Sequence, residues 1–104
     1  MNSTTEIVTM KTVDGISKDN FINIVDGLEK NFHSKQNGFI DSELLFNDKT
    51  GEWVIVQHWD NFENMQYASK KMFGNPVAEP FVKSLDPKSV KMQMLPQLGT
   101  WRKE

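Results

Sequence analysis

Apolar residues recur with two different periods along the first third of the chain. In residues 5–13, TEIVTMKTV, β-branched and polar residues alternate loosely, which is typical of a strand. Residues 18–35 follow a helical period instead, with Ser17 as the expected N-cap and Asn37-Gly38 as the expected end. One stripe of this helix carries the large apolar side chains Phe21, Ile24, Val25, Leu28 and Phe32.

The middle of the chain predicts a hairpin followed by a helix. Residues 39–47, FIDSELLFN, and residues 52–59, EWVIVQHW, have the composition of strands. The loop between them, NDKTG, ends in a glycine that suits a left-handed turn position. Asp60 is then expected to cap a helix, with Glu63 completing a capping box and Gly74 ending the helix.

The last third of the chain adds a short helix and a strand. Residues 75–85 begin with Asn-Pro, which suits a cap followed by the first helical position. Asp-Pro at 86–87 breaks this helix, and residues 89–96 alternate as a final strand. The element order β-α-β-β-α-β predicts the α+β, ferredoxin-like fold, with an antiparallel sheet covered by helices on one face.

This sheet is predicted to carry apolar residues on both faces. Strand 52–59 alternates Val54 and Val56 with Trp53, Ile55 and Trp59, and strand 39–47 places Phe39 and Leu45 opposite Ile40, Leu44 and Phe46. Helices cover only one face, and each large side chain left in water forgoes roughly 1.5–3 kcal/mol of burial. Since such patches mark interfaces, we expect a homodimer with the two sheets face to face. The alternative is that the C-terminal LGTWRKE folds over the second face.

Composition limits the classes of protein that the chain can belong to. Its 104 residues fit one domain, with a core at about 5–96 and a tail at 97–104. A net charge of −2 without basic runs argues against nucleic acid and membrane surfaces as partners. The strands also lack the aromatic and basic pattern of an RNA-binding sheet.

Several kinds of site are excluded by residues that the sequence lacks. With no cysteine there are no disulfides, thiolate nucleophiles or iron–sulfur clusters. His33 and His58 do not have the spacing of a metal motif, and no nucleophile elbow or phosphate-binding loop occurs. No segment has the roughly 20 apolar residues of a membrane helix, and the N-terminus lacks a secretion signal. We expect a soluble, cytoplasmic protein.

A known family combines several of these features. Its members share a helix followed by Gly-Phe, a hairpin, a strand ending in Trp, a polar cap and a helix rich in Met and Phe. In this chain the Gly-Phe pair is Gly38-Phe39 and the tryptophan is Trp59. Over about residues 5–96, the chain resembles the antibiotic biosynthesis monooxygenase (ABM) domain of the dimeric α+β barrel superfamily. The resemblance implies a homodimer with a pocket between the helices and the sheet of each subunit. It also implies a cofactor-independent monooxygenase, without cofactor or metal, that acts on a small aromatic or hydrophobic substrate.

Haem-degrading members of the same superfamily use an asparagine, a tryptophan and an iron-ligating histidine. By resemblance, and within about one residue, these positions correspond to Val8, Ala68 and Ala78 of this chain. None of the three family residues is kept, which argues against haem degradation.

Candidate site residues cluster around the junction of strand 52–59 and the following helix. His58 at the strand end and Tyr67 are the nearest proton carriers for acid–base catalysis. The alternative for His58 is a structural role, as a partly exposed histidine that is hydrogen-bonded to the backbone. His33 is expected to be solvated near a helix C-terminus. The candidate substrate-binding residues are Trp59, Met65, Ser69, Met72, Phe73 and Phe81.

Two functions are compatible with these residues. The first is a cofactor-independent oxygenase that binds a flat, electron-rich substrate and assists its deprotonation. The second is a non-catalytic dimer that uses the same pocket to bind a small apolar molecule or another protein. Ligand-induced thermal stabilisation without turnover would distinguish the second from the first.

Overall fold

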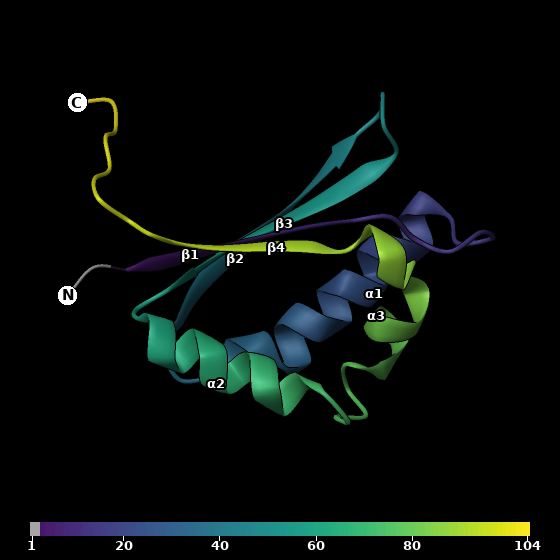
Figure 1. Cartoon of the computed structure of the whole chain (residues 1–104), viewed down its shortest axis with the longest axis horizontal. Coiled ribbons are helices and arrows are strands. Elements are labelled where there is room, and N and C mark those ends of the chain that lie inside the picture. Colours follow the sequence, from purple (N-terminus) through teal and green to yellow (C-terminus); the bar gives the residue numbers. More distant parts are fainter. Residues whose placement is uncertain (1–2) are drawn as a thin grey trace.

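The sheet and helices of the predicted fold are present in the computed structural model, which describes residues 3–104. Four antiparallel strands lie in the order β2-β3-β1-β4, and all helices cover one face (Figure 1). The strands are β1 (Thr4–Met10), β2 (Phe39–Asn47), β3 (Glu52–Trp59) and β4 (Lys91–Pro96). The helices are α1 (Lys18–Asn31), α2 (Phe62–Met72) and α3 (Glu79–Ser84), with 3₁₀ turns η1 (His33–Lys35) and η2 (Pro87–Ser89). The α+β, ferredoxin-like prediction is therefore confirmed for the single chain.

Helix α1 packs on the sheet through the predicted stripe. The Ser17 hydroxyl accepts a hydrogen bond from the Asn20 amide at 3.1 Å, so the predicted N-cap is confirmed. Phe21 is fully buried, and its ring centroid lies 4.8 Å from that of Trp53 on β3. The other side chains of this core include Met10, Val25, Leu28, Phe32, Ile55, Ala78 and Phe81.

The hairpin has the predicted bounds, but one side chain faces the other way. A register shift between Phe39 and Asp41 turns Phe39 to the helical side, where its ring centroid lies 5.3 Å from that of Trp59. The prediction that Phe39 shares a face with Leu45 is therefore wrong, because the extra residue interrupts the two-residue alternation.

The N-cap of helix α2 is one residue later than predicted. The side chain of Asn61, not Asp60, accepts the hydrogen bond from the Asn64 amide at 2.8 Å. Asp60 is held by the preceding junction instead, since its amide donates to the Gly38 carbonyl at 2.8 Å. Gly38 has φ +83°, and a Cβ there would overlap the side chains of Asp60 and Asn64. Only glycine fits this junction.

The remaining boundaries shift by a few residues. Strand β1 ends at Met10, and Thr12 forms an isolated bridge with Leu85. Residues 75–78 form turns, because the Asn75 side chain accepts from the Val77 amide at 2.9 Å rather than capping a helix. Helix α3 is therefore shorter than the predicted 75–85. Within residues 3–104, no helix is long and apolar enough to cross a membrane.

The outer face of the sheet, opposite the helices, is not covered by any part of residues 3–104. It is the side that carries Ile7, Leu45, Val54, Val56, His58 and Leu95. After Pro96 the C-terminal segment continues away from the sheet (Figure 1), and Trp101 is 91% exposed. The structure therefore does not show the alternative in which LGTWRKE folds over this face.

Candidate functional site

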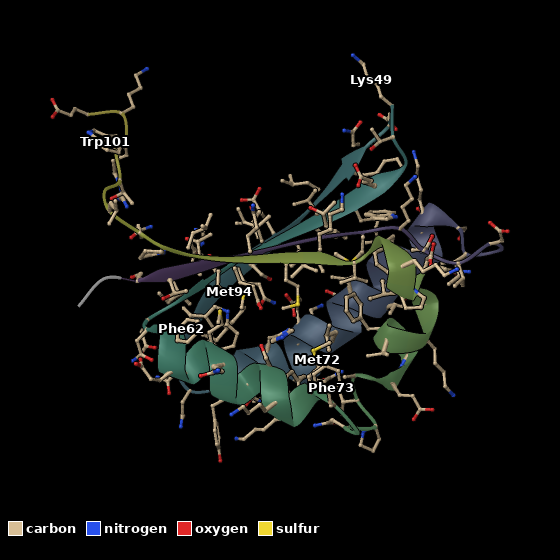
Figure 2. All side chains as sticks on the ribbon, in the orientation of Figure 1. Lys49, Phe62, Met72, Phe73, Met94 and Trp101 are labelled. Carbon is tan, nitrogen blue, oxygen red and sulfur yellow. The ribbon has the colours of Figure 1, made fainter. Side chains whose placement is uncertain are left out.

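A cavity of about 510 Å³ lies between the inner face of the sheet and the helices. Figure 2 shows Met72 and Phe73 at the C-terminal end of α2 and Met94 pointing from β4 toward that helix. The size suits a small organic ligand. Most lining side chains are apolar: Val8, Leu28, Ile55, Met72, Phe73, Phe81, Val82, Leu85, Pro87, Val90 and Met92.

Three buried polar side chains line the same cavity. Glu6 on β1 and Gln57 on β3 are opposite each other in the sheet register, and strand alternation turns both inward. His33 reaches the cavity from η1, directly after α1. Glu6 is 5%, Gln57 3% and His33 7% exposed. Buried polar groups in an otherwise apolar cavity are a candidate site for chemistry.

A hydrogen-bond network orients His33. Its Nδ1 pairs with the Glu29 carboxylate one helical turn earlier. Gln57 Nε2 donates to Glu29 Oε1 at 2.8 Å and lies 3.2 Å from His33 Nδ1, while Trp59 Nε1 donates to Gln57 Oε1 at 3.3 Å. Nε2 of His33 makes no hydrogen bond to any residue from 3 to 104. With Nδ1–H donated to Glu29, Nε2 is left as the basic nitrogen.

The pKa values of the two carboxyls near His33, Glu6 and Glu29, are shifted in opposite directions. Burial raises the pKa of Glu6. The charge of His33 partly offsets this increase in pKa, and the charge of Glu29 adds to it. Burial also acts to raise the pKa of Glu29, but hydrogen bonds from His33, Ser42 and Gln57, with the charge of His33, lower it overall. Relative to a free carboxyl, the protein therefore favours the ionised form of Glu29 and disfavours the ionised form of Glu6. Among residues 3–104, no three His, Asp or Glu side chains converge as a metal site.

Four of the predicted substrate-binding residues line the cavity. They are Ser69, Met72, Phe73 and Phe81. Trp59 and Met65 do not line it, because they pack with Ala68 and Phe39 in a second core cluster at the start of α2. Trp59 is 1% exposed, so it packs in this cluster rather than lining the cavity.

The two predicted proton carriers lie away from the cavity. His58 is on the outer face, because it alternates with Gln57 along β3, and its Nδ1 lies 2.6 Å from Asp41 Oδ1. Tyr67 is on the solvent side of α2, 60% exposed, with Lys71 Nζ 4.5 Å from its ring centroid. The structure brings neither into contact with the residues that line the cavity.

The buried polar cluster was missed by sequence reasoning. The prediction that His33 is solvated is wrong, because the chain turns after α1 and carries His33 between the helix and the sheet. Two signals were present in the sequence. Glu29 and His33 have the i,i+4 spacing of a helical pair, and Glu6 shares its strand face with Val8 and Met10.

Comparisons with known proteins show the fold. No protein-family model matches the chain, and no curated protein matches it. A solved structure of a SnoaB variant, a cofactor-independent oxygenase from Streptomyces nogalater, is 13% identical, with a TM-score of 0.73 over 99% of this chain and 100% of that chain.

Two further solved structures have the same fold. A protein from Chloroflexus aurantiacus assigned as an antibiotic biosynthesis monooxygenase is 16% identical, with a TM-score of 0.64 over 96% of this chain and 97% of its own. A dimeric ferredoxin-like protein from an uncultured marine organism is 13% identical, with a TM-score of 0.69 over 100% and 95%. The ferredoxin-like α+β fold implied by the sequence resemblance is thus confirmed.

Proposed function

We propose that the protein is a cofactor-independent monooxygenase that acts on a flat, apolar, electron-rich aromatic substrate bound in the cavity. The observation that carries this proposal is the pair of buried His33 and partly buried Glu29, of which His33 lines an almost wholly apolar cavity of about 510 Å³. An oriented base in such surroundings can remove a weakly acidic proton from a bound hydrocarbon-like molecule. The cofactor-independent oxygenase among the solved structures of this fold supports the same activity.

His33 is the proposed base. Its Nε2 accepts the proton of an activated C–H or phenolic O–H group, and the resulting imidazolium is stabilised by the Glu29 carboxylate on Nδ1. The substrate anion then reduces molecular oxygen at a ring carbon that carries its delocalised negative charge. For an anthrone, the CH₂ carbon gains one oxygen atom as a carbonyl, and the second oxygen atom leaves as water with both hydrogens. The protein moves the proton, and the substrate supplies the electrons.

Substrate binding is assigned to the apolar wall. Ser69, Met72, Phe73 and Phe81 come from three consecutive segments on one side of the cavity, opposite the sheet. Met72 is flexible and polarizable, and it can adapt to a ring system while excluding water. Trp59 and Met65 support this wall from the neighbouring core cluster. In this assignment His33 replaces His58 and Tyr67 as the proton carrier, because neither of those residues lines the cavity.

We further propose that two copies of the chain associate through their outer faces. The face presents half-buried or exposed apolar side chains from all four strands, and the described part of the chain leaves it uncovered. A patch of this kind is typical of an interface. One structure of the same fold is described as dimeric, which supports this arrangement. In such a dimer the cavities lie on the helical sides, away from the interface.

Oxygen uptake tests the monooxygenase proposal. Purified protein is incubated in air with a panel of anthrones and aromatic hydroquinones, while oxygen and the oxidised product are followed together. We expect uptake of one O₂ per molecule of quinone formed from anthrone. The variant Ser69→Phe, which fills the cavity, should lose this rate, whereas Tyr67→Phe on the solvent side of the same helix should keep it.

The result can also support the non-catalytic alternative. A rise in Tm with the panel compounds but no oxygen uptake above the background rate would identify a binding protein instead. Equal uptake by the wild type and Ser69→Phe would contradict the assignment of the cavity as the active site.

A further inference from the structure

Glu6 is the one member of the buried cluster that the Glu29–His33 network leaves without a hydrogen bond. Glu29 accepts from Gln57, and Gln57 accepts from Trp59. The Glu6 carboxyl makes no hydrogen bond to any residue from 3 to 104, although the residue is 5% exposed. Within the same residues every fully buried side-chain oxygen or nitrogen has a partner. The Glu6 oxygens therefore reach open space, and the space that Glu6 lines is the cavity.

The surroundings of Glu6 favour its neutral form. Titratable groups face it from α1 and η1, namely Glu29 and His33, and the uncharged Gln57 lies opposite on β3. On its other side β4 contributes Met94, and the helices beyond the cavity contribute apolar side chains. Burial and the Glu29 charge raise the pKa of Glu6. A neutral carboxyl carries one O–H, which is a hydrogen-bond donor that a carboxylate lacks.

We propose that Glu6 binds the oxygen atom of the substrate, donating its O–H to a carbonyl or phenolic oxygen that is conjugated with the carbon that His33 deprotonates. This inference deepens the proposed function and rests on its assignment of the cavity as the substrate site. It narrows the substrate class to apolar aromatic ketones and phenols. When the proton moves to His33, negative charge develops on the oxygen held by Glu6, where a preorganised donor has its largest effect.

Binding of two ligands of the same shape tests this role without requiring turnover. 1-Tetralone carries a ring carbonyl, and tetralin is its hydrocarbon counterpart. At a pH below 4.5, the ordinary carboxyl pKa that burial raises in Glu6, we expect wild-type protein to bind 1-tetralone about 2- to 10-fold more tightly than tetralin, which is the range for one net hydrogen bond. Affinities are measured by calorimetry or by the ligand-dependent rise in Tm.

Substitutions at Glu6 separate its contribution from those of its neighbours. Glu6→Gln keeps an N–H donor and should keep the preference, while Glu6→Leu should lose it. Tyr67→Phe is the matched control, because it removes a hydroxyl from the solvent side of α2, where Tyr67 is 60% exposed and does not line the cavity. It should leave the preference unchanged.

The pH dependence supplies a second readout. In the wild type the preference for 1-tetralone should fall as pH rises and Glu6 ionises. In Glu6→Gln this fall should be absent, whereas any contribution from titration of His33 or Glu29 remains in both proteins. The difference between the two pH profiles therefore belongs to Glu6.

Each outcome gives a distinct answer. Loss of the preference in Tyr67→Phe, or its retention in Glu6→Leu, would overturn the assignment to Glu6. Equal binding of both ligands by the wild type would overturn it as well, while the cavity stands as a binding site. If neither ligand binds, the proposed function fails together with the inference.

Discussion

The chain makes two histidine–carboxylate pairs, one on each face of the same sheet. On the inner side, the His33 and Glu29 side chains are 9% and 16% exposed. On the outer face, the His58 and Asp41 side chains are 32% and 63% exposed. The same chemical groups are therefore in different surroundings. Solvent screens the outer pair, so that its net contribution is small, whereas the inner pair acts in a medium of low dielectric.

Two adjacent residues of β3 contribute to these two surroundings, one on each face of the sheet. Gln57 and His58 are neighbours on β3, and alternation turns the first toward the helices and the second toward the outer face. Gln57 thereby joins the network around His33, and His58 meets Asp41 across the strand pair. A side chain that titrates near neutral pH is thus no guide to a site until its face of the sheet is known.

The largest expected effect is on oxygen uptake, which substitution of His33 should reduce and substitution of His58 should leave nearly unchanged. His33→Gln should lower kcat/KM for oxygen uptake by about 10²–10⁴-fold, which is the typical contribution of a general base. His58→Gln should stay within about twofold of the wild type, because His58 does not line the cavity. Circular dichroism and Tm establish that both variants are folded. A large loss in His58→Gln with an active His33→Gln would reverse the assignment.

The fold was predictable because its signals are local. The alternation at 39–47 and 52–59, the stripe of α1 and the Ser17 cap each depend on neighbours within a few residues. Gly38 had a recognisable position in the family resemblance. The structure adds its physical reason, which is the contact with Asp60 and Asn64.

The site was less predictable because it is assembled from distant segments. Glu6, Glu29, His33 and Gln57 come from β1, α1, η1 and β3, and no short motif joins them. Four of the residues predicted to bind substrate line the cavity, and three of them, Met72, Phe73 and Phe81, belong to the apolar pattern of α2 and α3. Polar residues carry no such pattern, so that a strand glutamate reads as exposed until its register is known.

The second effect tests whether the outer face is buried between two copies. Val56→Asp places a charge at the centre of that face, and we expect the dimer dissociation constant to rise about 30-fold or more. Val77→Asp is the matched control, because Val77 is 43% exposed on the turn before α3 and lies outside the sheet. Sedimentation equilibrium measures both. Dimers of unchanged affinity in Val56→Asp, or a monomeric wild type, would contradict association through this face.

The third effect is the loss of stability when the carboxylate of each histidine–carboxylate pair is removed. Glu29→Ala leaves His33 and Gln57 without their shared acceptor, which should lower the free energy of unfolding by about 2–3 kcal/mol. Asp41→Ala should cost less than about 1 kcal/mol. Urea unfolding at low and high salt measures both. Added salt should reduce the Asp41→Ala effect and leave the Glu29→Ala effect unchanged. Equal costs would mean that burial does not distinguish the pairs.

The smallest effect is a pH dependence of opposite sign at the two inner carboxyls. The pKa of Glu29 is lowered from 4.5, so its ionised form stabilises the fold above pH 4.5, and this stability is lost as pH falls through the folded pKa. The pKa of Glu6 is raised from 4.5, so its stabilising contribution is present below pH 4.5 and is lost as pH rises through the folded pKa.

Glutamine variants should therefore diverge from the wild type in opposite directions. Relative to wild type, Glu29→Gln should become less stable as pH rises from acid toward 6, because it lacks the ionised acceptor. Glu6→Gln should become more stable over the same rise, because it avoids burying a charge. Urea unfolding at each pH measures both differences. Parallel slopes would show that the two carboxyls share one environment, and the inner face would then hold a single acidic cluster rather than an ionised acceptor beside a neutral donor.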